Sequence, residues 1–531
     1  MKPLLSFVLI VFVLKLGAQI KHVFGPENVP VKDIRLNEVL GGDIMCFYTH
    51  KISTDSKTID HFIEKIDRKS LQSVWLKELS FKDDNYNIKL HRLIFNEDEL
   101  IAFVSKKNKK AKSIVFSVMT FAANSLTKLK ETILTSIDLR NEVDPKVIVK
   151  TNPDNTMALV KISMPSINYK ETITELAVYD IFESSKLWNK RISDDLKHNG
   201  NNDMIIDEEG NVHYIYFSVV GGVPRKETSY NLQYNFITRH LNTKRITLPF
   251  EMSAETQDLK ITILQNKTLC IAGTYREIDF TKKPEQLNAG IFNYVLDFYK
   301  SQIISKKFIA ENELNKNFEM VKTAPGVRKN YNIDDAIVNG NSCILIGHRS
   351  KSSDSVKVSP INFVSETNGL PEIDYFDIFL IKLNQSGEVE YCKNLPFCSK
   401  LRANCYMDMC DMKQIVKQYF NTANSDNLYL FHNEDPQTTK VLNSGNQPVT
   451  VVPLSENSKH FVCNKINLKD GSIARSIIEI PKDNAFTPVL ESDHSLAHPF
   501  ESKIFDKHRN NIYVPIKLTD QKERFLTITL E

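Results

Sequence analysis

One unit recurs along the chain: an apolar run that ends in a small polar turn and is followed by a second apolar run. It is clearest at residues 61–81, 175–193, 293–309, 377–397 and 460–480. Asp or Asn stands just before each turn, where its side chain can satisfy turn amides, at Asp67, Asp180, Asp297, Asn384 and Asn467. Apolar residues nowhere sustain the spacing of three and four that a helix requires, so the repeat predicts a chain that is nearly all β.

Two further apolar runs precede each unit, as at 332–341 and 342–351, which gives four strands per repeat. Four such strands, A to D from the inside outward, form one blade of a β-propeller. The centres of the expected B strands fall at Ile44, Ile101, Ala158, Tyr214, Leu269, Ile344, Tyr429 and Ile512. The expected fold is therefore a single eight-bladed β-propeller over residues 19–531, with seven blades as the alternative.

The last repeat supplies only three apolar runs, at 500–507, 510–518 and 523–531. We expect residues 19–24 to provide its missing outer strand. Closure of the ring by the N-terminal strand would remove an exposed sheet edge that otherwise invites aggregation.

The first 18 residues are typical of a cleavable signal peptide. Lys2 is followed by an apolar stretch from Leu4 to Leu14, and the small residues Gly17 and Ala18 precede Gln19. This stretch is shorter than the roughly 20 residues of a spanning helix, so we expect no transmembrane segment. A Cys for lipid attachment is absent after the expected cut. The prediction is an exported protein, either periplasmic or secreted.

Composition supports a large buried core and gives no case for nucleic acid. Hydrophobic residues make up 41% of the chain, with 30 Phe and 18 Tyr, which excludes wholesale disorder. The formal net charge is only +3, so nothing suggests a polyanionic partner.

Cysteine is too sparse, at eight residues in 531, for disulfides to be the main source of stability. Four of the eight crowd one segment, and we expect at least one local disulfide among Cys392, Cys398, Cys405 and Cys410, with the pairing open. The segment 405–412 also holds three Met, a composition that suits a soft metal such as Cu(I). Strand alternation would split these ligands between two faces, so core packing with one disulfide is the favoured interpretation.

The repeats IDRKSLQSVW and YDIFESSKLW resemble those of quinoprotein-like propellers and of the outer-membrane barrel-assembly lipoprotein. In those blades an apolar residue and Asp are followed by Thr-Gly and then Trp. Only Trp75 and Trp188 hold the aromatic position here, and Gly occupies the turn only at Gly387 and Gly471. The chain as a whole is similar to exported β-propeller proteins of Bacteroidota. This resemblance implies the fold and carries no activity with it.

Connection lengths distinguish the two faces of the expected ring. Strands alternate direction within a blade, so all B-to-C and D-to-A connections lie on one face, here the loop face, and the other turns lie on the turn face. Long polar connections fall only on the loop face of blades 5 to 7, near 277–290, 311–331, 350–373, 397–411, 432–459 and 481–498. Such loops either carry binding or reflect tolerated drift in length. The candidate binding residues on this face are Arg276, Arg328, Tyr331, Arg349, Arg402 and Tyr406.

An acidic residue stands at or just before each expected inner strand. The full series is Asp33, Asp84, Asp144, Asp203, Asp258, Asp334, Asp408 and Asp493, of which the last six are candidate binding residues. A ring of carboxylates at a channel mouth would suit a metal ion, with calcium as the candidate, or a cationic peptide. The alternative, which we favour, is that each Asp satisfies local amides where a loop becomes a strand.

Signatures of catalysis are missing from the sequence. It contains no H-E-x-x-H, G-x-S-x-G or G-x-x-x-x-G-K motif, and Pro499 argues against a helix that would present His494 and His498 to zinc. No cofactor is predicted. The leading hypothesis is a monomeric, non-enzymatic propeller that binds a protein, peptide or glycan through the loops of blades 5 to 8. The alternatives are a propeller enzyme, either a quinone-dependent dehydrogenase or a glycan-cleaving enzyme, and a purely structural role.

Overall fold

The computed structural model describes most of the chain. It covers residues 21–24, 34–35, 44–52, 59–67, 69–81, 83, 85–96, 98–108, 113–138, 145–165, 171–195, 202–220, 229–249, 254–277, 289–318, 330–352, 372–402, 419–434, 460–478, 487–488, 504–506, 511–517 and 523–530.

Seven four-stranded antiparallel sheets follow one another along the chain, each with its strands paired in chain order. Blade 1 contains β2 (Ile34–Arg35), β3 (Ile44–Ile52), β4 (Ile59–Asp67) and β5 (Ser73–Glu78). Blade 2 contains β6 (Tyr86–Asn96), β7 (Glu99–Asn108), β8 (Ser113–Ala122) and β9 (Lys128–Asp138). Blade 3 contains β10 (Lys146–Thr151), β11 (Met157–Pro165), β12 (Glu171–Asp180) and β13 (Ser185–Asp195). Blade 4 contains β14 (Asn202–Ile206), β15 (Val212–Val220), β16 (Ser229–Ile237) and β17 (Thr243–Leu248).

The second half of the chain continues the series. Blade 5 contains β18 (Ala254–Ile263), β19 (Leu269–Glu277), β20 (Ala289–Asp297) and β21 (Gln302–Ala310). Blade 6 contains β22 (Asn330–Asn339), β23 (Ser342–Ser352), β24 (Glu372–Leu383) and β25 (Val389–Arg402). Blade 7 contains β26 (Tyr419–Ala423), β27 (Asn427–Glu434), β28 (His460–Asn467) and β29 (Ile473–Ile478). A further sheet joins β1 (Lys21–Phe24), β33 (Glu523–Thr529), β32 (Asn511–Lys517) and β30 (Thr487–Pro488), with β31 (Ile504–Asp506) also on β32.

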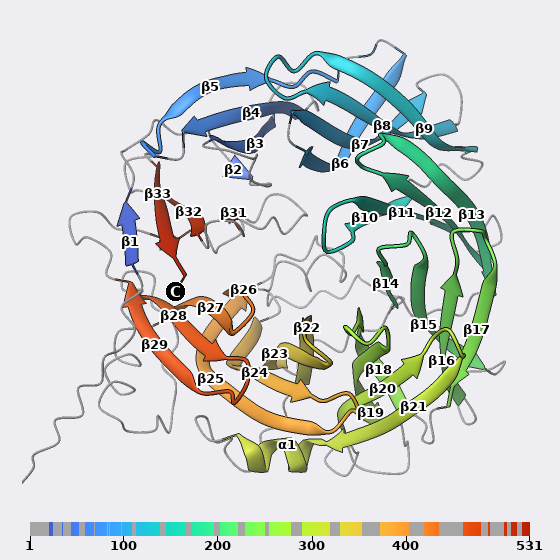
Figure 1. Cartoon of the computed structure of the whole chain (residues 1–531), viewed down its shortest axis with the longest axis vertical. Helices are drawn as coiled ribbons and strands as arrows, with labels where there is room; N and C mark the ends of the chain where they lie inside the picture. The colour runs from blue at the N-terminus through green and yellow to red at the C-terminus, as the bar shows by residue number, and fades with distance from the viewer. Residues whose placement is uncertain are drawn as a thin grey trace, which may run out of the picture.

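The sheets are arranged around a ring in chain order, with the first strand of each blade innermost and the fourth outermost (Figure 1). The sheet that contains β1 and β33 lies between blade 7 and blade 1 in this view. The predicted all-β propeller architecture is therefore confirmed.

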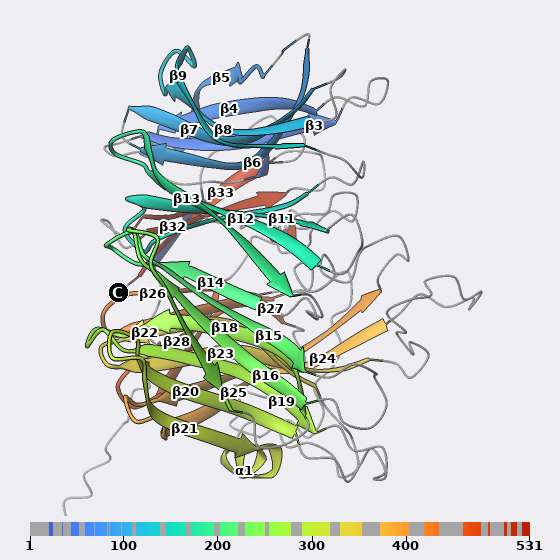
Figure 2. The same cartoon turned by 90° about the vertical axis from the view of Figure 1, so that its right-hand side faces the viewer.

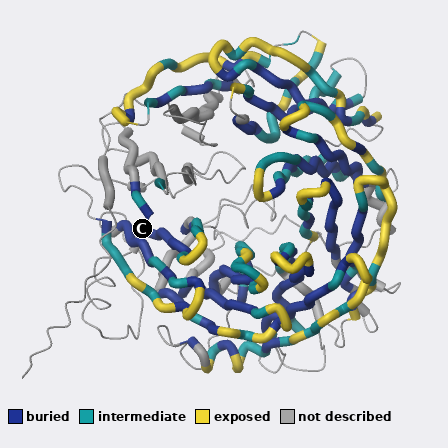
Figure 3. The backbone as a smooth tube through the Cα atoms, in the orientation of Figure 1, coloured by how far each residue is buried: buried dark blue, intermediate teal, exposed yellow. Residues whose placement is uncertain are grey.

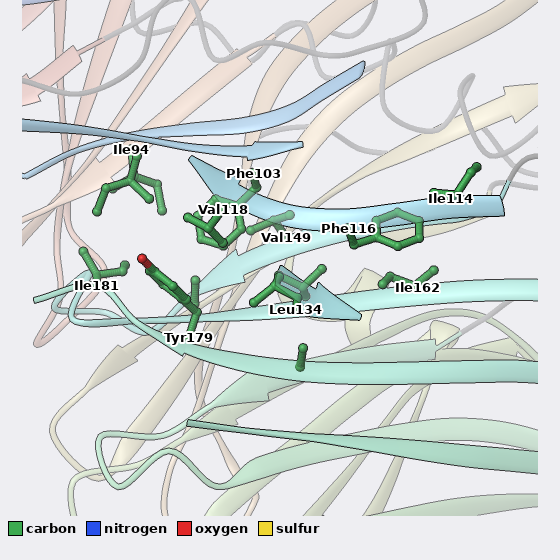
Figure 4. Close-up of a cluster of buried hydrophobic side chains, with 14 of the residues drawn as sticks. Ile94, Phe103, Ile114, Phe116, Val118, Leu134, Val149, Ile162, Tyr179 and Ile181 are labelled. Atoms are coloured by element: carbon green, nitrogen blue, oxygen red, sulfur yellow. The ribbon is translucent and has the colours of Figure 1, made fainter. Parts of the chain in front are cut away.

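The core lies in the seams between neighbouring blades. Each cluster of buried apolar side chains combines two consecutive blades, and burial is concentrated in the middle of the sheets (Figure 3). In the seam between blades 2 and 3, Phe103 packs edge-to-face on Tyr179 with ring centroids 5.8 Å apart (Figure 4). Sheets buried on both faces explain why the middle strands read as continuous apolar runs.

The Asp and Asn residues before the C-to-D turns cap those turns, as the sequence predicts. Asp67 Oδ1 accepts the Ser70 amide at 2.7 Å, and Asp180 Oδ1 accepts the Glu183 amide at 2.9 Å. Asn384 Oδ1 accepts two turn amides, those of Ser386 and Glu388, each at 2.9 Å. Asp297 and Asn467 accept turn amides in the same way.

Lysines on the outer strands join successive blades at the turn face. In blades 1 to 4 an outer-strand Lys Nζ donates to a carbonyl in the C-to-D turn of the following blade. The pairs are Lys77 with Asn124, Lys130 with Ser184, Lys190 with Leu241 and Lys244 with Tyr299, at 2.6 to 2.8 Å. These lysine bridges repeat from blade to blade, as the turn caps do, but each one joins two neighbouring blades.

Two connections expected as long loops contain residues of a helix or a strand. The expected connection 311–331 begins with the helix α1 (Glu311–Asn317), and the expected connection 397–411 begins as the end of β25. The helix was not foreseen because seven residues are too few to show a helical period. No helix in the described part of the chain has the length and apolarity to cross a membrane.

Candidate functional site

Blade 6 extends further than its neighbours on the loop face. Its β24 and β25 have 12 and 14 residues, the longest of the described strands. They stay paired from Leu383 with Val389 at the turn face to Glu372 with Arg402 at the far end. Figure 2 shows strand ends in the colour of this segment projecting from the body of the ring toward the right of the view, near the β24 label. We call residues 372–376 of β24 and 397–402 of β25 the blade 6 tip.

The pairing of β24 is irregular on both sides just where the tip begins. Against β23, Arg349 pairs with Asp377 but Ser350 pairs with Tyr375, so one residue of β24 is extra. Against β25, the register also shifts between Tyr375 and Asp377. A bulge bends its strand and increases the local twist. The blade 6 tip therefore begins at a bend between Tyr375 and Asp377.

A buried ion pair occupies this bend. Arg349 is 1% exposed and Asp377 is fully buried. Arg349 Nε donates to Asp377 Oδ1 at 2.6 Å, Arg349 Nη2 donates to Asp377 Oδ2, and Asn394 Nδ2 donates to that second oxygen at 2.9 Å. Such two-pronged pairing is directional as well as strong. Although burial works against the charged form, the bonds to Asp377 raise the pKa of Arg349.

The same guanidinium reaches the connection between blades 5 and 6. Arg349 Nη1 donates to Asn315 Oδ1 on α1 at 2.8 Å, and the Tyr331 hydroxyl donates to the same oxygen at 2.9 Å. The Phe318 ring lies beneath the guanidinium, with its centroid 4.5 Å from Arg349 Cζ. Burial raises the pKa of Tyr331, which keeps its hydroxyl protonated and able to donate. One side chain therefore links α1, β23 and β24.

The predicted loop-face residues fall in three kinds of place. Arg349 and Tyr331 are buried beneath the loop face, and Tyr331 is only 4% exposed. Both sides of a blade sheet pack against a neighbouring blade, so a side chain on either side of the sheet can be buried in a seam. Arg276 is half-buried near the loop-face end of β19, and Arg402 ends β25 at the blade 6 tip. Arg328 and Tyr406 lie outside the described residues. Ligand contact by any of the six stays a prediction.

The described acidic residues of the inner strands reach the next blade. Asp203 Oδ2 accepts the Ile261 amide of blade 5 at 3.1 Å, and Asp258 Oδ2 accepts the Ile333 amide of blade 6 at 3.3 Å. Inner strands are sheet edges with unpaired amides, so each carboxylate satisfies an edge group of its neighbour. This differs from the favoured interpretation, because the amide that each carboxylate satisfies belongs to the next blade and is not local.

Asp334 continues the same pattern with a side-chain donor. Its Oδ2 accepts the hydroxyl of Tyr419 in blade 7 at 2.5 Å and lies 2.7 Å from His348 Nδ1. Asp144, Asp408 and Asp493 lie outside the described residues. Among the residues that are described, no group of three or more His, Cys, Asp or Glu is placed to hold a metal ion. Calcium binding stays a prediction.

Cys392 is a buried free thiol. It therefore takes no part in the local disulfide that the sequence predicts among Cys392, Cys398, Cys405 and Cys410. It packs in the seam between blades 5 and 6, and burial raises its pKa to about 12. Cys398 lies in β25, while Cys405, Cys410, His494 and His498 lie outside the described residues.

Sequence reasoning missed the partners that hold Arg349. Asp377 carries a visible signal, since it is an acidic residue that opens the apolar run IFLIKL. A charge at the start of a buried strand requires a buried partner. Asn315 and Asn394 carry no comparable signal, because Asn is common in the polar turns and connections of this chain.

No protein-family model matches the chain, and no curated protein matches it. Among solved structures, the β-propeller domain of the trilobed protease from Pyrococcus furiosus is 9% identical over 84% of this chain and 92% of that one, with a TM-score of 0.31. A variant of Synechocystis apocarotenoid oxygenase is 8% identical over 97% and 94%, with a TM-score of 0.31. An α-L-arabinofuranosidase from Fusarium graminearum is 10% identical over 76% and 95%, with a TM-score of 0.28. Similarity this low carries no activity to the chain, so the fold assignment rests on its own strand pairing.

Proposed function

We propose that this chain is an exported, eight-bladed binding propeller that engages a protein, peptide or glycan through the loop face of blades 5 to 8, with the blade 6 tip at the centre. The main support for this proposal is that the blade 6 tip consists of paired strand ends and bends beside a buried ion pair. A preformed binding element loses little conformational entropy on association. Rigid scaffolds commonly carry binding in the elements that project from them.

The inner carboxylates in the described part of the chain have structural partners. Asp203 and Asp258 are engaged in bonds between blades, and Asp334 is bonded to Tyr419 of blade 7. Such bonds give these groups a structural use. The loop face is left as the surface on which ligand contact is proposed.

The eighth blade in the proposal is the sheet that contains both ends of the described chain. Lys21 to Phe24 pair with Thr529 to Leu526 in an antiparallel register. Deletion of residues 19–25 should expose the edge of β33, lower the melting temperature and promote oligomers. Thermal scans and size-exclusion chromatography on the deletion variant check this, and a variant as stable and monomeric as the parent would count against closure by this strand.

The binding proposal is tested on peptide and glycan arrays with the chain lacking residues 1–18. Lys400→Glu with Arg402→Glu alters the blade 6 tip. Lys267→Glu with Lys300→Glu makes the same charge change on the turn face of blade 5, where these side chains are 68% and 76% exposed. We expect the parent to bind a restricted set of array ligands, the tip variant to lose them, and the turn-face variant to keep them. Absence of parent binding, or equal binding by both variants, would contradict the proposal.

A further inference from the structure

We propose that Arg349 and Asp377 are positioning residues that set the direction of the blade 6 tip and couple it to α1. The binding consequence rests on the proposed function, whereas the effect on the tip itself does not.

Stability is a poor explanation for the pair. Removing two charges from water is costly, and apolar side chains of similar volume often stabilise a buried site as well or better. Arg349 and Asp377 are both almost completely buried. A pair retained at such a site is best explained by the geometry that it imposes.

The geometry is imposed on three strands close to the level at which Arg349 pairs with Asp377. Arg349 on β23 pairs in register with Asp377 on β24, and Asn394 on β25 donates to the same carboxylate. Both ladders around β24 shift register immediately beyond this level. The planar guanidinium group donates to a carboxylate in few orientations, so the pair fixes the relative placement of the strands where they bend.

The coupling to α1 runs through Asn315. Its Oδ1 accepts from Arg349 and from Tyr331, so displacement of α1 would remove a partner from the guanidinium that holds the bend. The helix contacts β20 and β21 of blade 5 and β25 of blade 6. It therefore lies between two blades whose connections flank the tip.

Blade 4 provides a matched comparison. Its buried His213 lies 2.8 Å from the Tyr234 hydroxyl through Nδ1 and 3.3 Å from Asp207 Oδ2 through Nε2. All three residues belong to one blade, and their ladders have no register shift. This network is therefore buried and polar, like the one in blade 6, but the strands around it have no bend.

The test replaces each network with apolar residues. The blade 6 variant is Arg349→Met with Asp377→Leu and Asn394→Leu, and the control is His213→Leu with Tyr234→Phe. We measure melting temperature, amide hydrogen exchange at 372–376 and 397–402, and the distance between spin labels on noncanonical residues at positions 400 and 267. We expect the blade 6 variant to melt near the parent, its tip amides to exchange at least about tenfold faster, and its distance distribution to broaden. The control should leave the tip unchanged.

A parent-like tip in the blade 6 variant would overturn the inference. Should that variant fail to fold, Asn315→Ala removes the acceptor on α1 for Arg349 and Tyr331 and leaves the ion pair with Asp377 in place. It should speed tip exchange by about threefold, and tip exchange at parental rates would refute the coupling. Peptide and glycan arrays separate the two proposals. A disordered tip with unchanged array binding rejects the proposed function and leaves the positioning role standing, whereas an ordered tip rejects the positioning role whatever the arrays show.

Discussion

The turn face and the loop face of the ring hold their strands in different ways. On the turn face, blades 1 and 3 share the same two interactions, an Asp that caps the C-to-D turn and a Lys that reaches the next blade. On the loop face of blade 6, the strands are held by Arg349 and Asp377, at a bend that breaks the regular register. Repeated interactions are partly exposed and individually weak, whereas this pair is buried.

The difference indicates how stability and specificity are divided in the molecule. Many small, similar interactions cap turns and join successive blades, and loss of one should leave the rest in place. A single buried pair concentrates its effect at one bend. The predictions below compare these two ways of holding strands, from the largest expected effect to the smallest.

Removal of one partner from the buried pair should cost the most. Asp377→Ala leaves the Arg349 charge buried without its carboxylate, which should lower the free energy of unfolding by about 3–5 kcal/mol. Denaturant titration followed by circular dichroism measures the loss. A loss no larger than that of a turn-face variant would remove the contrast between the two faces.

Loss of an inner carboxylate should cost less. Asp258→Ala leaves the Ile333 amide without this acceptor, with an expected loss of about 1–3 kcal/mol, whereas Asp258→Asn should cost under about 1 kcal/mol because the amide oxygen still accepts. Thermal scans with calcium and with chelator accompany the denaturant titrations. We expect no calcium effect; a stabilisation by calcium that an Asp203→Asn, Asp258→Asn variant loses would instead support the predicted cation site.

Loss of one turn cap should cost about 1 kcal/mol. Asn384→Ala removes the acceptor of the Ser386 and Glu388 amides, and both amides gain water in exchange because the turn is exposed. Asn384→Asp keeps the acceptor and should be close to the parent. Both variants are compared by denaturant titration, and a large loss in Asn384→Asp would show that the cap does not act through its oxygen.

The partly exposed carboxylate of blade 2 should show a modest dependence on pH. Burial alone would raise the pKa of Glu131, but hydrogen bonds from Lys106, Lys128 and Ser117 lower it to about 2. Because the folded pKa lies below the unfolded value of 4.5, the stabilisation is complete above pH 4.5 and is lost as the pH falls toward 2. Glu131→Gln should therefore be less stable than the parent at pH 7, and the difference should shrink below pH 4.5 in denaturant titrations. Solvent screening keeps the effect small.

Some features of the site could be predicted from the sequence and others could not. The caps at Asp67 and Asn384 follow from turn chemistry, which involves residues two to four positions away. Arg349 was correctly expected in a blade 6 strand, whereas Tyr331 was expected in the connection 311–331 and lies in β22. Both were expected at the loop face, and the structure buries both. Their exposure depends on whether α1 and blade 5 cover them, which no local pattern reports.

The sequence by itself determined the strands, their grouping into blades and the turn residues, because alternation and turn capping depend on neighbours in the chain. Only the tertiary structure decided where the polar groups of the seams find partners. Arg349 meets Asp377 across 28 residues, Asp258 meets the Ile333 amide across 75, and Asp334 meets Tyr419 across 85. Such pairs form only after strands pack into blades and blades into a ring, since the repeat specifies each unit while the seam between two units depends on both.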